Sequence, residues 1–141
     1  MRGDISSQFL TSLLLSAPLA RDAVQVDIEG ELVSKPYLDI TLALMKSFGA
    51  TAEHLNYEVF KVQPGNYRAV DSYLIEGDAS NATYFLAAGA ISGTGVTVHG
   101  LGRDSVQGDL AFTEVLRAMG AGVDVGAVSY THLTLPTNRE V

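Results

Sequence analysis

Two short polar stretches hold the residues of this sequence that are best suited to bind a ligand. Ser6, Ser7 and Gln8 stand at the expected start of one helix, and Ser34 and Tyr37 stand at the expected start of another. The first N–H groups of a helix lack intrahelical partners and the helix dipole is positive there, so such a start favours an anion. Serine hydroxyls add neutral donors. Serine also commonly caps helices, so from the residues alone both uses stay open.

The surrounding chain passes twice through the same order of helix and strand patterns. Apolar residues at helical spacing predict four helices, over residues 9–17, 35–48, 82–91 and 112–119. Alternating apolar and polar residues predict strands, over residues 23–29, 51–56, 57–62, 67–76, 96–99 and 123–125. The glycine pairs Gly30 and Gly100, and Gly49 and Gly120, recur at nearly the same offset. The pattern therefore predicts an α/β (α+β) protein built from duplicated units.

Several side chains have expected places in these elements. The first helix is apolar almost all round, which predicts burial on most of its sides. Ser34 is expected at the N-cap of the second helix, and Asp39 is expected as an exposed charge on it. Asp78 is expected to cap a helix rather than to act as an acid, and His54 is expected to pack in a strand rather than to bind a metal.

The composition narrows the classes of function. The 141 residues are 47% hydrophobic and 18% charged, as in a folded domain, and the net charge of −7 without a basic run argues against nucleic acid. The absence of cysteine excludes disulfides and thiolate metal sites and fits a reducing cytoplasm. No apolar run reaches the roughly 20 residues of a membrane span. We therefore expect a cytoplasmic protein with no metal, no membrane and no nucleic-acid partner.

The tail from Val128 to Val141 departs from this pattern. Its first part, Val128-Ser129-Tyr130-Thr131-His132-Leu133-Thr134-Leu135-Pro136-Thr137, resembles the translation of a transposase-end sequencing adapter. We expect residues 128–141 to be an adapter-derived artefact, and they are left out of the fold prediction. An uninterrupted genomic coding sequence that reads into this tail would contradict that expectation.

Five stretches resemble the enolpyruvyl-shikimate-phosphate (EPSP) synthase family. They are Ser6-Ser7-Gln8-Phe9-Leu10, Ser34-Lys35-Pro36-Tyr37, Glu76-Gly77-Asp78-Ala79-Ser80, Tyr84-Phe85-Leu86-Ala87-Ala88 and Gly102-Arg103-Asp104-Ser105-Val106-Gln107-Gly108-Asp109. The resemblance implies a fold of two similar domains made of repeated βαβαββ units, of which this chain is an incomplete, internal fragment. Residues 1–76 are then the end of the N-terminal domain and residues 77–127 the start of the C-terminal one.

The resemblance also implies an activity. Members of the family transfer the enolpyruvyl group of phosphoenolpyruvate to the 5-hydroxyl of shikimate 3-phosphate and release phosphate. The reaction belongs to the shikimate pathway, which leads to chorismate and the aromatic amino acids. These transferases work without metal or organic cofactor, and we expect full-length members to be monomers. By resemblance, Ser6, Ser7, Gln8, Ser34 and Tyr37 bind shikimate 3-phosphate, and Gln8 also lies near phosphoenolpyruvate.

Two alternative functions remain open, and both are compatible with the expected fold class. One is a relative of UDP-N-acetylglucosamine enolpyruvyl transferase, which lacks the paired Ser-Ser-Gln and Ser-Lys-Pro-Tyr motifs. The other is a stand-alone module that binds a phosphorylated metabolite. The family's proton-transfer Asp and Lys and its cationic clamp match no residue of this chain, so no catalytic residue is assigned. The chain alone is expected to be inactive.

Overall fold

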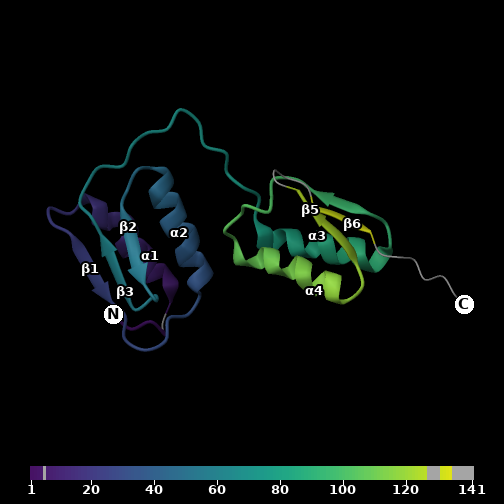
Figure 1. Ribbon diagram of the computed structural model, residues 1–141, viewed down its shortest axis with the longest axis horizontal. Helices are drawn as coiled ribbons and strands as arrows, with labels where there is room; N and C mark the ends of the chain where they lie inside the picture. The colour runs from purple at the N-terminus through teal and green to yellow at the C-terminus, as the bar shows by residue number, and fades with distance from the viewer. Residues whose placement is uncertain (5, 127–130, 135–141) are drawn as a thin grey trace, which may run out of the picture. The chain divides into compact units, whose positions relative to one another are not determined.

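The computed structural model describes residues 1–4 and 6–126, and the backbone of residues 131–134. The chain divides into two compact units, Met1–Tyr73 and Leu74–Val141, each with its own sheet and helices (Figure 1). Within the described residues, no helix is both long enough and apolar enough to cross a membrane.

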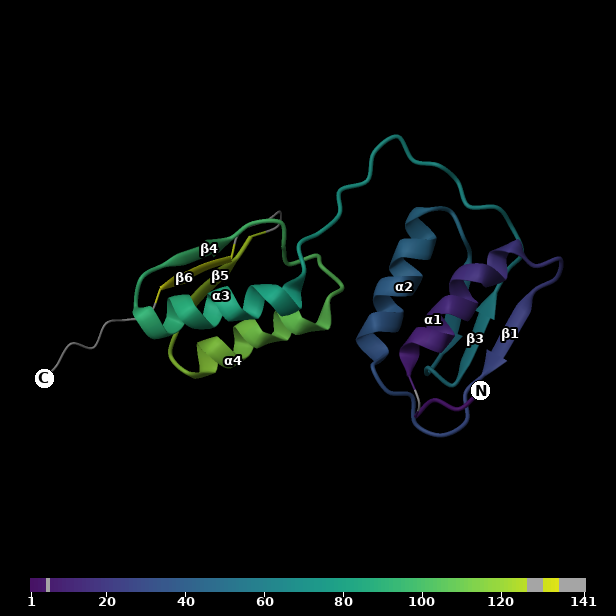
Figure 2. The same cartoon turned by 180° about the vertical axis from the view of Figure 1, so that it is seen from behind.

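The first unit packs two helices on one face of a three-stranded antiparallel sheet (Figures 1 and 2). Its elements are α1 (Ser7–Ser16), the 3₁₀ turn η1 (Ala17–Leu19), β1 (Val24–Asp27), α2 (Lys35–Ser47), β2 (Ala52–Leu55) and β3 (Val59–Val62). The strand order is β1-β3-β2, so the strand that comes last in the chain is the central one. Ahead of α1, Arg2 forms a parallel bridge to Glu29, just beyond β1.

The core of this unit follows from the alternation along β3. Phe60 and Val62 are fully buried, whereas Lys61 between them is exposed on the other face of the sheet. The largest buried side chains that the helices add are Leu10, Leu14, Leu38 and Met45. Burying a large apolar side chain contributes roughly 1.5–3 kcal/mol, so this cluster is the main source of stability in the first unit.

Helix α1 is buried along one stripe only. Leu10 and Leu14 are 1% and 0% exposed, but Phe9 is 63% and Leu13 is 41% exposed. The prediction of burial on most sides is therefore wrong for the described chain. A helix that rests on one sheet and one neighbouring helix presents only one stripe to them, whatever the composition of its other faces.

The second unit repeats the topology of the first, which confirms the predicted duplication. Its elements are α3 (Ala79–Ser92), β4 (Val96–Val98), the 3₁₀ turn η2 (Gly108–Ala111), α4 (Phe112–Ala118), β5 (Gly122–Val125) and β6 (Thr131–Thr134). The strand order is β4-β6-β5, again with the last strand in the centre and antiparallel to both neighbours. Both helices lie on one face of this sheet (Figure 2). Strand β6 comes from the tail at residues 128–141, whose origin stays a prediction.

Asp78 caps α3, as predicted from the sequence. Its Oδ1 accepts hydrogen bonds from the backbone N–H of Ser80 at 2.9 Å and of Asn81 at 3.4 Å. The same oxygen accepts from the Ser80 hydroxyl at 2.7 Å. These donors favour the charged carboxylate, so the pKa of Asp78 is lowered, mainly by the Ser80 hydroxyl.

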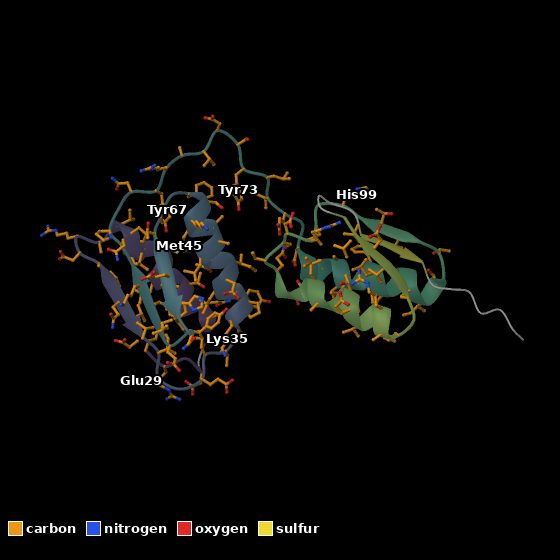
Figure 3. All side chains as sticks on the ribbon, in the orientation of Figure 1. Glu29, Lys35, Met45, Tyr67, Tyr73 and His99 are labelled. Carbon is orange, nitrogen blue, oxygen red and sulfur yellow. The ribbon has the colours of Figure 1, made fainter. Side chains whose placement is uncertain are left out.

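The strand predicted over residues 67–76 is absent from the described structure. The segment instead runs past the end of α2, where the Arg68 N–H donates to Phe48 O at 2.8 Å. The ring centroids of Phe48 and Tyr73 lie 5.2 Å apart, and the Tyr67 hydroxyl donates to Leu15 O at 2.8 Å. Tyr67 and Tyr73 are labelled in Figure 3. An alternating pattern forms a strand only where a sheet edge accepts its backbone, and here side-chain contacts hold the segment elsewhere.

Candidate functional site

The five residues predicted to bind a ligand line one hollow in the first unit. The hollow has a volume of about 780 Å³ and lies where α1 and α2 begin. Its lining residues are Ser6, Ser7, Gln8, Thr11, Ser12, Ser34, Tyr37, Ile40 and Thr41. The structure therefore brings together two polar stretches that are far apart in the sequence.

Ser6 and Ser7 differ in what they do at the start of α1. Ser6 is the N-cap, with an extended backbone at φ −168°, and its Oγ accepts a hydrogen bond from Gln8 N at 3.2 Å. Ser7 is only 8% exposed, and its hydroxyl bonds no residue in the described part of the chain. Ser6 therefore caps the helix, and the Ser7 hydroxyl stays available to a ligand in the hollow.

Ser34 takes an unexpected backbone conformation at the start of α2. It stands at the N-cap position as predicted, but at φ 60° and ψ 39°, in the left-handed region, and its side chain makes no capping bond. Side-chain capping needs an extended N-cap. Pro36 lacks an N–H group, and the Tyr37 N–H already donates to Ser34 O at 3.1 Å. The Ser34 hydroxyl therefore has no role in the helix and is free to meet a ligand.

The lining of the hollow is uncharged, and most of its residues carry a polar group. Among the described residues that line it, none carries a charged side chain, so its donors are hydroxyl and amide groups and helix N–H groups. The nearest cation in sequence, Lys35 at the start of α2, has its Nζ 5.6 Å from the ring centroid of Tyr57 (Figure 3). Two helix starts supply the positive potential instead. This arrangement suits an anionic ligand that also carries hydroxyl groups.

Sequence reasoning missed four lining residues: Thr11, Ser12, Ile40 and Thr41. A signal was present, because Thr11 comes four residues after Ser7 and Thr41 four after Tyr37, which puts each pair on one helix face. The Ser12 hydroxyl donates to Gln8 O at 2.9 Å and is therefore partly used by the helix itself.

Other candidates in the sequence have structural roles. His54 stacks on Tyr57 with ring centroids 4.1 Å apart, and its Nδ1 accepts from Tyr57 N at 3.2 Å, as expected of a packed histidine. Asp39 is half-buried and accepts from the Tyr57 hydroxyl, so the prediction of an exposed charge is wrong. No group of three His, Asp or Glu side chains that could hold a metal ion occurs in the described residues.

The fold and the hollow together define a class: a duplicated α/β protein with an anion-favouring pocket between two helix starts. Residues 1–139 match the family model for EPSP synthase (3-phosphoshikimate 1-carboxyvinyltransferase), so the chain belongs to the EPSP synthase family.

Curated relatives support this membership. Proteins named 3-phosphoshikimate 1-carboxyvinyltransferase from Sulfurovum sp. and from Cronobacter sakazakii are each 58% identical to this chain over 125 residues. A protein of the same name from Shewanella denitrificans is 55% identical over 125 residues. Each comparison covers 88% of this chain but only 29% of the relative. The chain thus spans less than a third of the length of these relatives.

Proposed function

We propose that this chain forms part of the shikimate 3-phosphate site of an EPSP synthase. That transferase moves the enolpyruvyl group of phosphoenolpyruvate to the 5-hydroxyl of shikimate 3-phosphate and releases phosphate. The observation that carries the proposal is the convergence of Ser6, Ser7, Gln8, Ser34 and Tyr37 on one neutral hollow. Family membership supplies the reaction and the substrates.

Four of the five residues have a role toward the ligand that their chemistry supports, while the Ser6 side chain also caps α1. Ser7 and Ser34 offer hydroxyls that the fold leaves unused, beside two helix starts that favour the phosphate group. The exposed Gln8 amide donates and accepts at once, which suits a ring hydroxyl and a neighbouring phosphoenolpyruvate. Tyr37 adds a phenolic wall and a further donor.

The chain by itself has no synthase activity under this proposal. Addition and elimination at an enol ether need positioned acid and base groups, and cations for two phosphates. The described lining of the hollow contains neither. An assay that supplies both substrates and measures phosphate release should give the rate of buffer alone, and turnover by purified chain would contradict this.

We extend the proposal to the domain boundaries of this chain and to the complete transferase. Residues 1–76 belong to the end of the N-terminal domain, residues 77–127 to the start of the C-terminal domain, and residues 128–141 derive from an adapter. The complete transferase is a cytoplasmic monomer that uses no cofactor and binds neither nucleic acid nor membrane. The acidic composition, with a net charge of −7, is in keeping with the absence of a nucleic-acid partner.

Calorimetric titration of shikimate 3-phosphate into the purified chain tests the proposed site. Ser7→Ala and Ser34→Ala each remove a hydroxyl that makes no hydrogen bond to the described residues, so the fold should be unchanged. A hydrogen bond to a charged group is worth about 1.5–3 kcal/mol. Each variant should therefore weaken binding by about tenfold or more.

Ser72→Ala is the matched control, because Ser72 is exposed, lies outside the hollow, and its hydroxyl makes no hydrogen bond with the described residues. It should bind as the parent does. Equal binding by the parent, Ser7→Ala and Ser34→Ala would overturn the proposed site. Preference for a UDP-amino-sugar over shikimate 3-phosphate would instead indicate the sister transferase.

A further inference from the structure

A second layer of hydroxyls connects the two helices that carry the proposed site. The Thr41 hydroxyl donates to Tyr37 O at 2.8 Å, and Thr41 Oγ1 lies 3.3 Å from Thr11 Oγ1. Thr41 is only 6% exposed, and it is one of few buried polar residues in this unit. Both threonines also line the hollow. The bond between Thr11 and Thr41 thus joins helices α1 and α2 close to their serine-bearing starts, and the bond from Thr41 to Tyr37 O continues from it along α2.

The chemistry of the groups determines which atom donates in each of these hydrogen bonds. A carbonyl oxygen only accepts, so the single hydroxyl proton of Thr41 goes to Tyr37 O. Thr41 must then accept from Thr11, whose own proton is used in that bond. The Thr11 hydroxyl therefore offers lone pairs alone to the hollow, and a ligand group facing it has to be a donor such as a hydroxyl.

The threonine pair lies one helical turn below the proposed ligand contacts. Ser7 and Thr11 are four residues apart on α1, and Tyr37 and Thr41 are four apart on α2. Residues at that spacing share a helix face. The bond between Thr11 and Thr41 thus crosses from one helix to the other directly beneath the two starts.

We propose that Thr41 is a positioning residue, which holds the two helix starts at a fixed spacing through its hydroxyl and Thr11. The proposal rests on the proposed function, because the spacing matters only to a ligand that both starts bind. A ligand that two starts share loses affinity when their separation varies, since the site must then be ordered at the expense of binding.

Two substitutions at Thr41 separate its hydroxyl from its packing. Thr41→Val keeps the shape and removes the hydroxyl, whereas Thr41→Ser keeps the hydroxyl and removes a methyl group. Titration of shikimate 3-phosphate into the full chain should show about tenfold weaker binding for Thr41→Val and less than threefold for Thr41→Ser. Parent-like binding by Thr41→Val, or a larger loss in Thr41→Ser than in Thr41→Val, would overturn the proposal.

A measurement without ligand distinguishes failure of this inference from failure of the proposed function. Urea unfolding of Thr11→Val, Thr41→Val and the double variant forms a double-mutant cycle. Each variant changes the unfolding equilibrium constant by some factor relative to the parent. We expect the factor for the double variant to differ by about two- to tenfold from the product of the factors for the two single variants. If the parent does not bind shikimate 3-phosphate, the proposed function fails, and the double-mutant cycle alone then tests the coupling of Thr11 and Thr41. Additive effects there would show that the two threonines are not coupled and would overturn the inference.

Discussion

The hydroxyl of Tyr57 donates a hydrogen bond of 2.8 Å to Asp39 Oδ1, which ties the turn between β2 and β3 to helix α2. Asn56 and Tyr57 both have positive φ, at 52° and 60°, and the Glu58 N–H donates to Leu55 O at 2.9 Å. Two consecutive positive φ angles define the type I′ hairpin turn, which normally takes glycine at the second position. The bond to Asp39 therefore supports a tyrosine in a position that disfavours it.

Removal of that hydroxyl should destabilise the first unit. In Tyr57→Phe the ring keeps its stacking with His54, but the bond to Asp39 is lost. We expect the free energy of unfolding to fall by about 1 kcal/mol, measured by urea denaturation. Tyr84→Phe is the control, because Tyr84 is 74% exposed on α3, and it should unfold as the parent does. A parent-like midpoint for Tyr57→Phe would refute the stabilising role.

The same bond predicts a pH dependence. The hydrogen bond to Asp39, with burial and the Asp39 charge, raises the pKa of Tyr57 above its ordinary value of 10.0. A group whose pKa is raised in the folded state adds stability below its unfolded pKa and loses it as the pH rises through the folded pKa. The stability difference between the parent and Tyr57→Phe should therefore be constant from neutral pH up to pH 10.0 and shrink above it. A difference that grew with pH would exclude this linkage.

Helix α3 should lose stability in acid through its cap. The pKa of Asp78 is lowered from 3.8, chiefly by the Ser80 hydroxyl, so its contribution is present above pH 3.8 and is lost as the pH falls through the lower, folded value. Asp78→Ala should lower the melting temperature at pH 7 and remove this acid-dependent part. Asp78→Asn keeps an acceptor without the charge and should lie between the parent and Asp78→Ala at pH 7. Equal pH profiles for the parent and Asp78→Ala would contradict the assignment.

Gln107 should hold the loop before η2 onto the start of α3. Its Nε2 donates to Glu76 Oε2 at 2.9 Å and to Gly77 O at 2.8 Å, and its Oε1 accepts from Ala79 N at 2.9 Å. Gln107→Glu removes both donated bonds and puts a second carboxylate beside Glu76. We expect a lower melting temperature at pH 7 and partial recovery near pH 4, where carboxyl groups begin to take up protons.

The control for this substitution is Gln63→Glu. Gln63 is exposed, and its side chain makes no hydrogen bond with the described residues, so the same change of charge should have little effect there. An equal loss of melting temperature in both variants would mean that net charge, and not the bonds of Gln107, is responsible.

Gly89 in α3 should resist replacement by alanine, although alanine favours helices. A Cβ atom at Gly89 would lie 2.7 Å from Val96 Cγ2 and 2.8 Å from Val96 Cβ, where the helix packs on β4. The usual gain of about 1 kcal/mol for Gly→Ala is then outweighed by overpacking of roughly 1–3 kcal/mol. Urea unfolding should show a less stable Gly89→Ala, and this loss should be smaller in a chain that also carries Val96→Gly, which removes both contacting carbon atoms. A more stable single variant would disprove the clash.

The local parts of the fold could be predicted from the sequence because they depend on neighbours in the chain. Asp78 caps α3, and Gly49 ends α2 with φ 80°, because each acts on groups within a few residues. The two neighbouring strands predicted over residues 51–56 and 57–62 are present for the same reason, and Ala52–Leu55 and Val59–Val62 pair with each other. The two polar stretches were also recognisable, since a helix start and a serine are both local features.

What the sequence could not provide depends on contacts made at a distance. Nothing local to Asp39 indicates a bond to Tyr57, and nothing local to Phe9 indicates that its side chain is left 63% exposed among the described residues. The left-handed backbone of Ser34 arises where the chain turns from one element into the next, at a residue type that seldom adopts it. The bond between Thr11 and Thr41 joins residues on two helices, so only the packing of α1 on α2 creates it.

The second sheet depends on its central strand, β6. β4 and β5 each pair with β6 and not with one another, so without it two strands would face each other across about 9–10 Å, twice the usual spacing. Such a slot presents unpaired N–H and C=O groups on both walls. Strand pairing is how such a slot is filled, and an extended segment with free N–H and C=O groups, from the same chain or from a neighbouring copy, satisfies it. The central strand of this unit is thus supplied by residues that follow β5. The source of that strand determines whether the sheet forms within one molecule or by domain swapping between two copies.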